Sequence, residues 1–571
     1  MQSIRRMSEY PAGCSLLLLL TLALPPAFAQ TSASPNTTPD TRTHFDRRLT
    51  PGEQHAVRAF DRARNAKANA LALEVFLKKM PKGGDLHMHL SGAIYAETFL
   101  KDAAVENLCV NPTTETLDKS TRPAVAAAAA TPPKCLAGAE PAADAFNDQK
   151  LYDALVDAWS MRTFVPSEGI SGHDQFFATF DRFAAVTEAH PGEWLNDVAT
   201  RAARQNEQYL EVMVTPDFGI AAKLGYAIGW PATPPGDQID PGGDTTGTSP
   251  AELGDLREKL LAGGLRQDVA IDEKQMDSDL AARTQIEHCG RPDAAKACSV
   301  KIRYLYQVLR AFPPQQVFAQ TLLAFEVASQ DPNVVGLNFV QPEDAYLAMS
   351  EYNRQMHMLD YLHSVYPRVH ISLHAGELAP GLVPPKGLTF HIHEAIDLGH
   401  AERIGHGVDV MYEHAPYALL KEMADRHIMV EINLTSNAVI LGVVPPYHPL
   451  PEYLAAHVPV ALSTDDEGVS RIDLTHEYVR AAMEYGLGYI DLKTMARTSL
   501  QHSFLPGESL WKKPDDFTQV KQVCAGQPVG ASTPSRECAA LLKSSQKATG
   551  QWELEHRFSV FEAGLSRESY K

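Results

Sequence analysis

Short apolar runs alternate with longer amphipathic segments along most of this chain. Eight short runs are candidate strands: 84–90, 208–214, 301–307, 334–339, 369–375, 403–406, 428–432 and 459–464. Between several of them, apolar residues recur at helical spacing, as in 314–330, 346–366, 389–399 and 415–426. Strands that alternate with helices form a parallel sheet, and eight such strands favour a closed (β/α)8 TIM barrel.

Several segments do not fit this repeat. Apolar residues at helical spacing in 53–80 predict an N-terminal helical extension before a barrel that spans 81–510. Surface insertions are expected near 110–148, which is rich in Ala and Pro, and near 218–298. Residues 511–571 are expected to form a C-terminal insertion and a helix packed on the barrel. The apolar face of the helical extension at 53–80 could also form a homodimer contact, although packing beneath the barrel is the simpler interpretation.

The N-terminus has the pattern of an export signal. Arg5 and Arg6 precede an apolar run at 14–24, and small residues lead to an expected cleavage after Ala29, followed by a polar linker at 30–52. The run is shorter than the roughly 20 residues that a membrane-spanning helix needs. We therefore expect a periplasmic or secreted protein that has no membrane contact after cleavage. The arginine pair leaves both the general and the twin-arginine export routes open.

Composition and charge narrow the range of partners. Of 571 residues, 44% are hydrophobic and 21% charged, as in a soluble protein with a large core. The formal net charge is −19. Nucleic acid and anionic membranes both require a basic surface, so this charge argues against them. A small molecule is the more consistent partner.

The cysteines fall into local pairs. Of the seven, Cys14 lies in the signal, and the other six form the pairs Cys109 with Cys135, Cys289 with Cys298, and Cys524 with Cys538. An even number behind an export signal predicts three disulfides, with free buried thiols as the alternative.

Four short motifs carry groups that can bind metal or move protons. His87-Met88-His89 ends the first candidate strand, where side chains two residues apart point to the same face. The other motifs end the fifth, sixth and eighth strands: His374-Ala375-Gly376-Glu377, Arg403-Ile404-Gly405-His406-Gly407 and Ser463-Thr464-Asp465-Asp466-Glu467. Each alone has an ordinary explanation, such as a helix N-cap for the paired acids.

The positions of the motifs favour a shared site. All four fall at the carboxyl ends of candidate strands, where barrel enzymes place their active sites. Three histidines and one aspartate also make a complete set of donors for zinc, with room for a water molecule. The sequence therefore predicts a metal-dependent enzyme.

With these motifs the chain resembles the adenosine deaminases of the metal-dependent amidohydrolase superfamily, and it is most similar to their secreted, growth-factor-related branch. The matching segments follow the family's order over about residues 80–505. They are Met80-Pro81-Lys82-Gly83, His87-Met88-His89-Leu90, His374-Ala375-Gly376-Glu377, Arg403-Ile404-Gly405-His406-Gly407, Ser436-Asn437 and Ser463-Thr464-Asp465-Asp466.

The resemblance implies a role for each site residue. One Zn²⁺ per chain would be held by His87, His89, His374 and Asp465, and would lower the pKa of its water to about 7. Glu377 would protonate N1 of the purine, His406 would orient the water and stabilise or accept its proton, and Asp466 would hydrogen-bond the water or N7. The substrate would be adenosine, and 2′-deoxyadenosine as well, giving inosine and ammonia.

The substrate-binding positions depart from the family in two places. Ser91 stands where many members carry the aspartate that binds the ribose hydroxyl, and Gln341 replaces the glycine whose N–H meets purine N3. Glu343 and Asp344 match the family's acidic pair, and Gly376 completes the expected substrate-binding set. These departures leave the reaction class intact and the choice of nucleoside open.

Two other kinds of function remain as alternatives. One is another amidohydrolase, acting on adenine, on a modified adenosine or on a dipeptide. A two-metal enzyme of this kind would want a bridging Lys or Glu after a middle strand, and Asn338 and Gln341 offer neither, which favours one metal. The other is a catalytically silent binding or signalling protein. Such a protein is expected to lack a metal ligand or a catalytic residue, whereas all four ligands and all three catalytic residues are present in this sequence.

Overall fold

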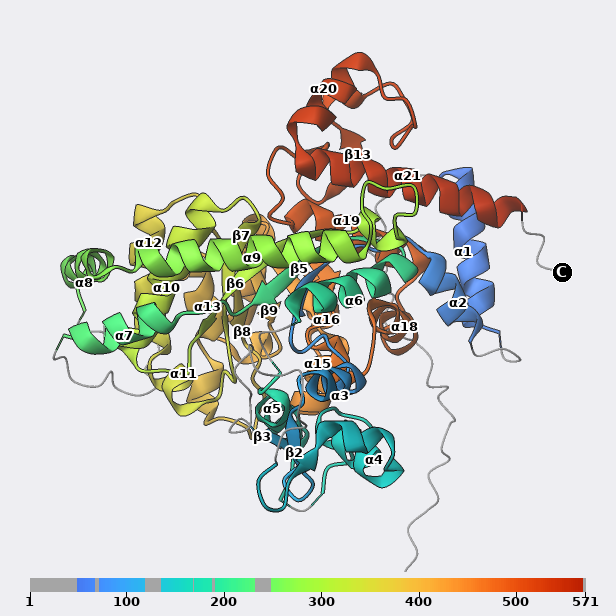
Figure 1. Ribbon diagram of the computed structural model, residues 1–571. Coiled ribbons are helices and arrows are strands. Elements are labelled where there is room, and N and C mark those ends of the chain that lie inside the picture. Colours follow the sequence, from blue (N-terminus) through green and yellow to red (C-terminus); the bar gives the residue numbers. More distant parts are fainter. Residues whose placement is uncertain are drawn as a thin grey trace, which may run out of the picture. The chain divides into compact units, whose positions relative to one another are not determined.

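The computed structural model (Figure 1) describes residues 49–66, 71–118, 135–167, 169–186, 190–231 and 248–567. The expected signal peptide at 1–29 and nearly all of the expected linker at 30–52 lie outside the described residues. Parts of the two expected barrel insertions, 119–134 and 232–247, also lie outside them.

Eight parallel strands form a closed barrel. They are β1 (Gly83–His89), β5 (Glu207–Val214), β6 (Lys301–Leu309), β7 (Val334–Val340), β8 (His370–Ala375), β9 (Arg403–His406), β10 (Met429–Ile432) and β11 (Val460–Leu462). They pair in that order, and each neighbouring pair is parallel. A parallel bridge between Met88 and Asp465 closes the circle between β1 and β11. The predicted (β/α)8 barrel is confirmed, and every strand bound lies within two residues of its candidate run.

Helices lie between successive strands and pack on the outside of the barrel. After β6 and the later strands they are α10 (Pro314–Gln330), α11 (Tyr346–Ser350), α12 (Tyr352–Val365), α13 (His391–Asp397), α14 (Pro416–Asp425), α15 (Leu434–Leu441), α16 (Leu450–Ala455), α17 (Glu467–Ser470), α18 (Leu474–Glu484) and α19 (Tyr489–His502). In α10 every residue from Gln316 to Val327 is buried. It is buried on nearly every face because α7 (Gly219–Ile228), α9 (Arg266–Ile286) and α12 cover the side that turns away from the barrel.

In its described residues, the long connection between β1 and β5 contains a small sheet and four α-helices. The helices are α3 (Ala96–Val105), α4 (Gln149–Ala158), α5 (Gly172–Phe183) and α6 (Pro191–Arg204). The strands β2 (Cys109–Asn111), β3 (Thr116–Asp118) and β4 (Glu140–Pro141) form an antiparallel sheet. Strands of two or three residues are too short to give a periodic signal, so composition indicated only an irregular insertion.

The described part of the expected insertion at 218–298 is mainly helical. It contains α7 (Gly219–Ile228), α8 (Pro250–Gly263) and α9 (Arg266–Ile286). Ser249 and Glu252 form a capping box at the start of α8, and Gly264 ends that helix in the left-handed conformation with φ 111°.

The C-terminal segment forms a small hairpin and two helices. The hairpin is β12 (Trp511–Lys513) with β13 (Asp516–Val520), and the helices are α20 (Arg536–Ser544) and α21 (Gln546–Arg567). The structure forms all three expected disulfides: Cys109–Cys135, Cys289–Cys298 and Cys524–Cys538. The last of these lies in a local apolar cluster with Leu510 and Trp552.

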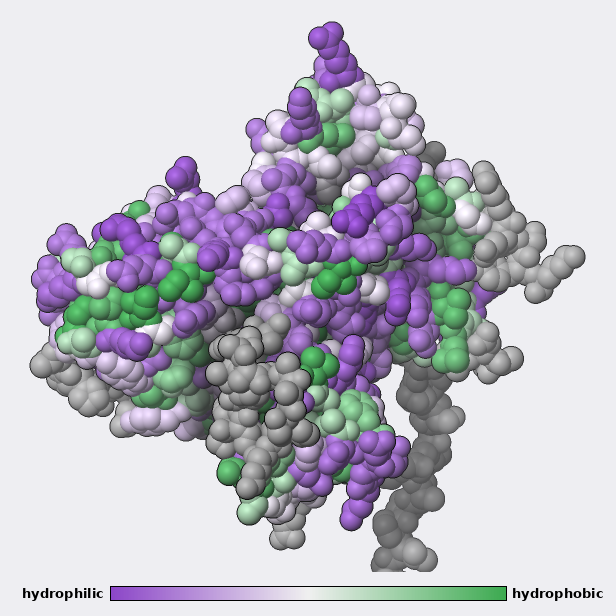
Figure 2. All heavy atoms as spheres, viewed as in Figure 1, coloured by the Kyte–Doolittle hydropathy of each residue, from purple (hydrophilic) through white to green (hydrophobic). Residues whose placement is uncertain are grey.

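The face seen in Figure 2 is largely hydrophilic, in keeping with the high net charge. A smaller apolar area lies near α7, where Ile228 and Trp230 are only partly buried. Among the described helices, none is both long enough and apolar enough to cross a membrane.

A buried ion cluster joins the N-terminal extension to the C-terminal helix. The extension consists of α1 (Pro51–Arg64) and α2 (Ala72–Lys79). Lys493 of α19 lies 3.1 Å from Glu53 Oε1 of α1 and 2.6 Å from Glu562 Oε1 of α21, and its side chain is only 5% exposed. Tyr489 donates a further hydrogen bond to Glu562 at 2.8 Å. One ammonium group therefore connects three helices that are far apart in the sequence.

We expect the substitution Lys493→Met to destabilise the protein strongly. Removing the cation from a buried ion pair costs about 3–5 kcal/mol, because the remaining carboxylates stay desolvated. Urea unfolding followed by circular dichroism should show a clearly lower midpoint. Lys421→Met is the matched control, since its pair with Asp425 is largely exposed and should contribute little. Equal midpoints for the two variants would contradict this account.

Candidate active site

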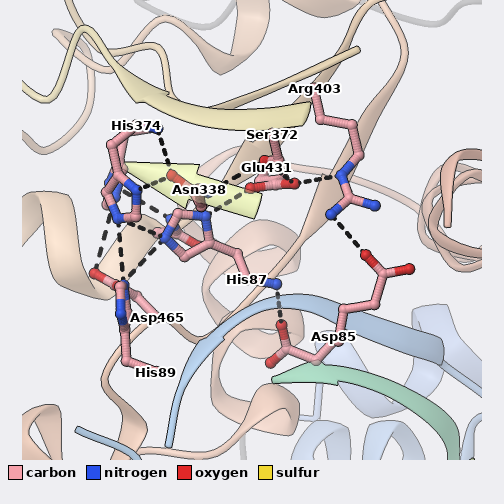
Figure 3. Close-up of polar contacts among 12 residues, drawn as sticks. Asp85, His87, His89, Asn338, Ser372, His374, Arg403, Glu431 and Asp465 are labelled. Carbon is pink, nitrogen blue, oxygen red and sulfur yellow. Dashed lines mark hydrogen bonds and ion pairs between the residues drawn. The ribbon is translucent and has the colours of Figure 1, made fainter. Parts of the chain in front are cut away.

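Four potential metal ligands converge at the carboxyl end of the barrel (Figure 3). His87 and His89 lie on β1, His374 lies on β8, and Asp465 follows β11. Asp465 has a positive φ of 59°, which is uncommon for a residue other than glycine. Its backbone N–H donates to the His87 carbonyl at 2.8 Å, so barrel closure holds it in this conformation.

The donor atoms have the spacing of a tetrahedral site. His374 Nε2 lies 3.1 Å from His87 Nε2 and 3.2 Å from His89 Nε2. Asp465 Oδ1 lies 3.4 Å from His87 Nε2 and 3.2 Å from His89 Nε2. Donors bound tetrahedrally at about 2.0–2.1 Å would stand about 3.3–3.4 Å apart. The four side chains can therefore hold one metal ion without rearrangement.

Polar side chains on the barrel strands orient these histidines. Glu431 Oε2 accepts from His87 Nδ1 at 2.6 Å, and Asn338 Oδ1 accepts from His374 Nδ1 at 2.8 Å. Gln307 contacts His89 Nδ1. Each contact engages Nδ1 and leaves Nε2 facing the site, which is the usual arrangement around a metal.

The carboxylate of Glu431 is itself held by a buried network. Arg403 Nε donates to Glu431 Oε1 at 2.6 Å, and Ser372 Oγ donates to the same oxygen at 3.0 Å. The other end of the guanidinium pairs with Glu211 Oε2 at 2.7 Å. This network fixes the ring of His87 (Figure 3).

The sequence analysis assigned no role to these supporting residues. In the sequence, Gln307, Asn338 and Glu431 stand out only as polar residues inside apolar candidate strands. That signal does not say which histidine each residue contacts, because the partners lie on other strands.

Electrostatics favour neutral imidazoles at His89 and His374 beside an ionised aspartate. Although burial opposes it, the carboxylates of Asp465 and Glu431 raise the pKa of His87 to about 10, so this ring would have to release a proton on binding a metal. Burial and the neighbouring imidazoles lower the pKa of His374 well below its usual value. Burial also lowers the pKa of His89. Although burial opposes it, the contacts with His87 and His89 lower the pKa of Asp465 well below the usual range. Neutral imidazoles and a carboxylate are the forms that bind metal.

Two further acids lie beside the ligands. Burial, together with the charges of Asp465 and Glu343, raises the pKa of Glu377 well above its usual value. Burial and Asp465 do the same for Asp466. Within the described part of the chain, Glu377 Oε1 and Asp466 Oδ1 are buried and find no hydrogen-bond partner. A carboxyl group that stays protonated in such a place can act as a general acid.

His406 completes this group at the end of β9. Its ring is buried, which lowers the pKa to about 3 and keeps the imidazole neutral. Nδ1 lies 3.5 Å from Glu377 Oε1, and Nε2 lies 4.0 Å from Asp465 Oδ2. The structure thus brings together all seven residues that the sequence assigned to metal binding and acid–base chemistry.

Glu343 has a different position from the one expected for a substrate-binding residue. Its carboxylate is fully buried and accepts from the backbone N–H of Gly376 at 3.0 Å and of Glu377 at 2.8 Å. His391 Nδ1 lies 2.5 Å from it as well. Burial opposes ionisation, but His391 and Arg310 lower the pKa of Glu343 to about 2. Glu343 therefore holds the loop that carries Glu377, with both oxygens engaged.

Gly376 occupies a place where no other residue fits. Its φ is 74°, and a Cβ there would lie 2.4 Å from Asp409 Oδ1. The glycine lets the chain turn sharply between His374 and Glu377, so both side chains reach the same site.

The other expected substrate positions lie at the same end of the barrel. Gln341 has φ 85°, a conformation that favours glycine, and its side-chain oxygen accepts from Ala311 N at 2.9 Å. The side chain is thus held by the neighbouring loop, while the backbone keeps a glycine-like path. Asp344 is half-buried and lies 2.9 Å from His173 Nε2 on α5. Ser91 is half-buried in the turn after β1.

Sequence comparisons agree with the motifs. Residues 273–513 match the family model described as adenosine deaminase. The adenosine deaminase of Escherichia coli strain SE11 is 36% identical over 140 residues, which is 24% of this chain and 39% of that protein. The chain therefore matches well under half the length of this curated relative.

Two solved structures are among those compared with the chain. Arabidopsis ADAL complexed with IMP is 21% identical with a TM-score of 0.46, over 75% of this chain and 93% of that one. The adenine deaminase of Arthrobacter aurescens is 14% identical with a TM-score of 0.45, over 75% and 94%.

The family-model match, the sequence identity to adenosine deaminases and the motif residues gathered at the barrel mouth lead to one assignment. Over residues 273–513 the chain is similar to the adenosine deaminase family.

Proposed function

We propose that this protein is a zinc-dependent deaminase that hydrolyses the 6-amino group of adenosine and 2′-deoxyadenosine, giving inosine and ammonia. The observation that carries the proposal is a buried acid, Glu377, placed beside a preformed site of three histidines and Asp465. Deamination of a purine needs both an activated water and a proton donor for the ring, and these groups supply the two requirements.

Zinc is the metal that these residues fit best. Imidazole nitrogens with one carboxylate oxygen suit Zn²⁺, and a tetrahedral donor spacing is typical of it. Ligation by Nε2 with Nδ1 engaged elsewhere also matches zinc sites in which second contacts orient each histidine. When bound, zinc would lower the pKa of a water molecule to about 7 and so prepare it for attack.

Glu377 supplies the proton that the purine ring requires. Burial and the nearby charges of Asp465 and Glu343 raise its pKa, which favours the protonated carboxyl group that can donate to a ring nitrogen such as N1. Protonation there draws electrons from C6 and makes that carbon easier to attack. Glu343 holds the two backbone amides at Gly376 and Glu377, which fixes the direction of the acid.

His406 and Asp466 lie where they can bind the attacking water. His406 is neutral and buried, with Nε2 facing Asp465. Asp466 packs closely against Gly92 in the turn after β1. A Cβ at position 92 would lie 1.4 Å from Asp466 Oδ1, so the glycine leaves the space that the aspartate side chain occupies. Together they can exchange hydrogen bonds with the water and with the purine edge.

We expect Glu377→Gln to lose deaminase activity by at least about 10²-fold, because an amide cannot deliver the proton that general acid catalysis needs. Ultraviolet absorbance and ammonia release should be followed with adenosine, 2′-deoxyadenosine, adenine, a modified adenosine and AMP in parallel. Glu394→Gln is the matched control, since Glu394 is also buried with a raised pKa of about 7 but contacts Asn353 on the outside of the barrel.

The substrate panel also tests the alternatives. Ser91 and Gln341 depart from the family pattern, so a preference for adenine or a modified adenosine would revise the substrate and keep the reaction. No ammonia from any compound, in protein that holds one zinc, would overturn the deaminase proposal and favour a different amide substrate or a silent binding role.

The purified protein should contain about one zinc ion per chain, and a chelator should abolish its activity until zinc is restored. Elemental analysis measures the metal directly. His374→Ala should lose the ion because it removes one of four ligands. His370→Ala is the control from the same strand, since His370 is partly exposed at the far end of β8 and pairs with Glu402. Full zinc content in the His374 variant would contradict the assigned site.

We also propose that the protein is exported, as in the secreted branch that its motifs resemble. The N-terminal pattern and the three disulfides support this, because disulfides persist in oxidising compartments. Protein recovered from the periplasm or medium should begin at Gln30, as read by N-terminal sequencing. Replacing Ala27 and Ala29 by leucine should block this cleavage, whereas an uncleaved wild-type chain in the cytoplasm would contradict export.

A further inference from the structure

A row of hydrogen bonds leads from a backbone amide to the buried ring of His406. Its first member is the N–H of Leu450, at the start of α16, which lies 3.2 Å from His448 Nδ1. A backbone amide can only donate, so Nδ1 of His448 must accept and carries no proton. Burial, aided by Arg480, lowers the pKa of His448 to about 3, and the ring is neutral. Its single proton is therefore on Nε2.

The proton on His448 fixes the orientation of Asn437. His448 Nε2 lies 3.1 Å from Asn437 Oδ1, and a protonated nitrogen must meet an oxygen there. The amide of Asn437 consequently turns its Nδ2 to the other side, where it lies 2.9 Å from His406 Nδ1. The Nδ2 of Asn433 lies 3.4 Å from the same ring nitrogen. Both amide groups are donors, so His406 Nδ1 accepts.

The last step places the proton of His406. A neutral imidazole whose Nδ1 accepts must carry its proton on Nε2. That atom faces Asp465 Oδ2 at 4.0 Å and, among the described residues, has no hydrogen-bond partner of its own. The ring therefore presents an N–H group to the place where the proposed water reacts.

We propose that His448 is a positioning residue, which acts through Asn437 to hold His406 in the tautomer that donates a hydrogen bond from Nε2 into the reaction site. This proposal rests on the deaminase function for its effect on catalysis. A fixed donor stabilises negative charge as it develops on the attacking oxygen, without any reorganisation at the moment of reaction. Of the two roles that the sequence left open for His406, stabilising the water and accepting its proton, this arrangement selects the first.

The hydrogen-bonded relay from Leu450 through His448 and Asn437 to His406 is held by α15 and the loop after it. Asn437 lies on α15, and its backbone N–H donates to the Asn433 carbonyl at 3.0 Å. His448 is buried in the loop between α15 and α16, where its ring packs edge-on against Tyr485. Neither side chain is a metal ligand, so each can be changed without removing a donor from the proposed zinc site.

The tautomer can be observed directly by NMR. Full-length enzyme labelled with ¹⁵N in its histidine rings would be studied by long-range ¹H–¹⁵N correlation, with and without zinc, and His406 assigned from its loss in His406→Gln. We expect a protonated Nε2 and an unprotonated Nδ1 in the wild type. Asn437→Asp places a carboxylate beside Nδ1 and should move the proton to that nitrogen. A wild-type His406 with its proton on Nδ1 would overturn the proposal.

Kinetics of variants test the consequence for catalysis. His448→Leu removes the donor and frees the Asn437 amide to turn, and it should lower kcat by about 10–100-fold with little change in KM, as for other orienting contacts. His448→Gln keeps an N–H in place of Nε2 and should recover most of kcat. Asn437→Asp should also lower kcat. Tyr485→Phe keeps the neighbouring ring and serves as the control.

The possible outcomes separate the relay from a general structural effect. Equal losses for His448→Leu and His448→Gln, with no change in the His406 tautomer, would show that His448 only supports the loop and would overturn the proposal. If His448→Leu does not fold, the nearly isosteric Asn437→Asp carries the same test. An Nε2-protonated His406 that responds to Asn437→Asp in an enzyme without deaminase activity would support the relay and reject the proposed reaction.

Discussion

The parallel bridge between Met88 and Asp465 is the contact on which both the barrel and its active site depend. It joins the first strand to the last, and so converts a sheet of eight strands into a closed one. The same bridge fixes Asp465 with φ 59°, between two histidines of β1. Because closure and the placement of Asp465 share one segment of backbone, the four candidate ligands come together only in the closed barrel.

Inside the barrel, a network of buried charged side chains holds the candidate ligands in position. Arg403 is fully buried between Glu211 and Glu431, and Glu431 accepts a hydrogen bond from the ring of His87. Charges in such surroundings are costly unless each is paired and hydrogen-bonded. The network therefore stabilises only one arrangement of the strands, and that arrangement points the histidine at the metal position. The paired charges of Glu211, Arg403 and Glu431 therefore keep the ring of His87 in one orientation.

Sequence reasoning succeeded where a residue's environment is set by its own strand or turn. The eight strands were found within two residues because parallel strands covered on both faces are continuous apolar runs. His87 and His89 share a face because side chains alternate along a strand. The roles of Asn338 and Glu431 were missed because each orients a histidine on another strand. Glu343 was assigned to the substrate, whereas tertiary packing directs it to the backbone of Gly376 and Glu377.

By itself, the sequence determined the barrel and the candidate ligands and acids at its mouth, because both follow from periodicity and from residue types at strand ends. Only the tertiary structure decided how protons and charges are distributed among those residues. The side of His406 that carries its proton depends on Asn437, His448 and the amide of Leu450, which lie 31 residues or more further along the chain. A hydrogen bond depends on distance and direction in space, and neither is encoded in the identity of one residue.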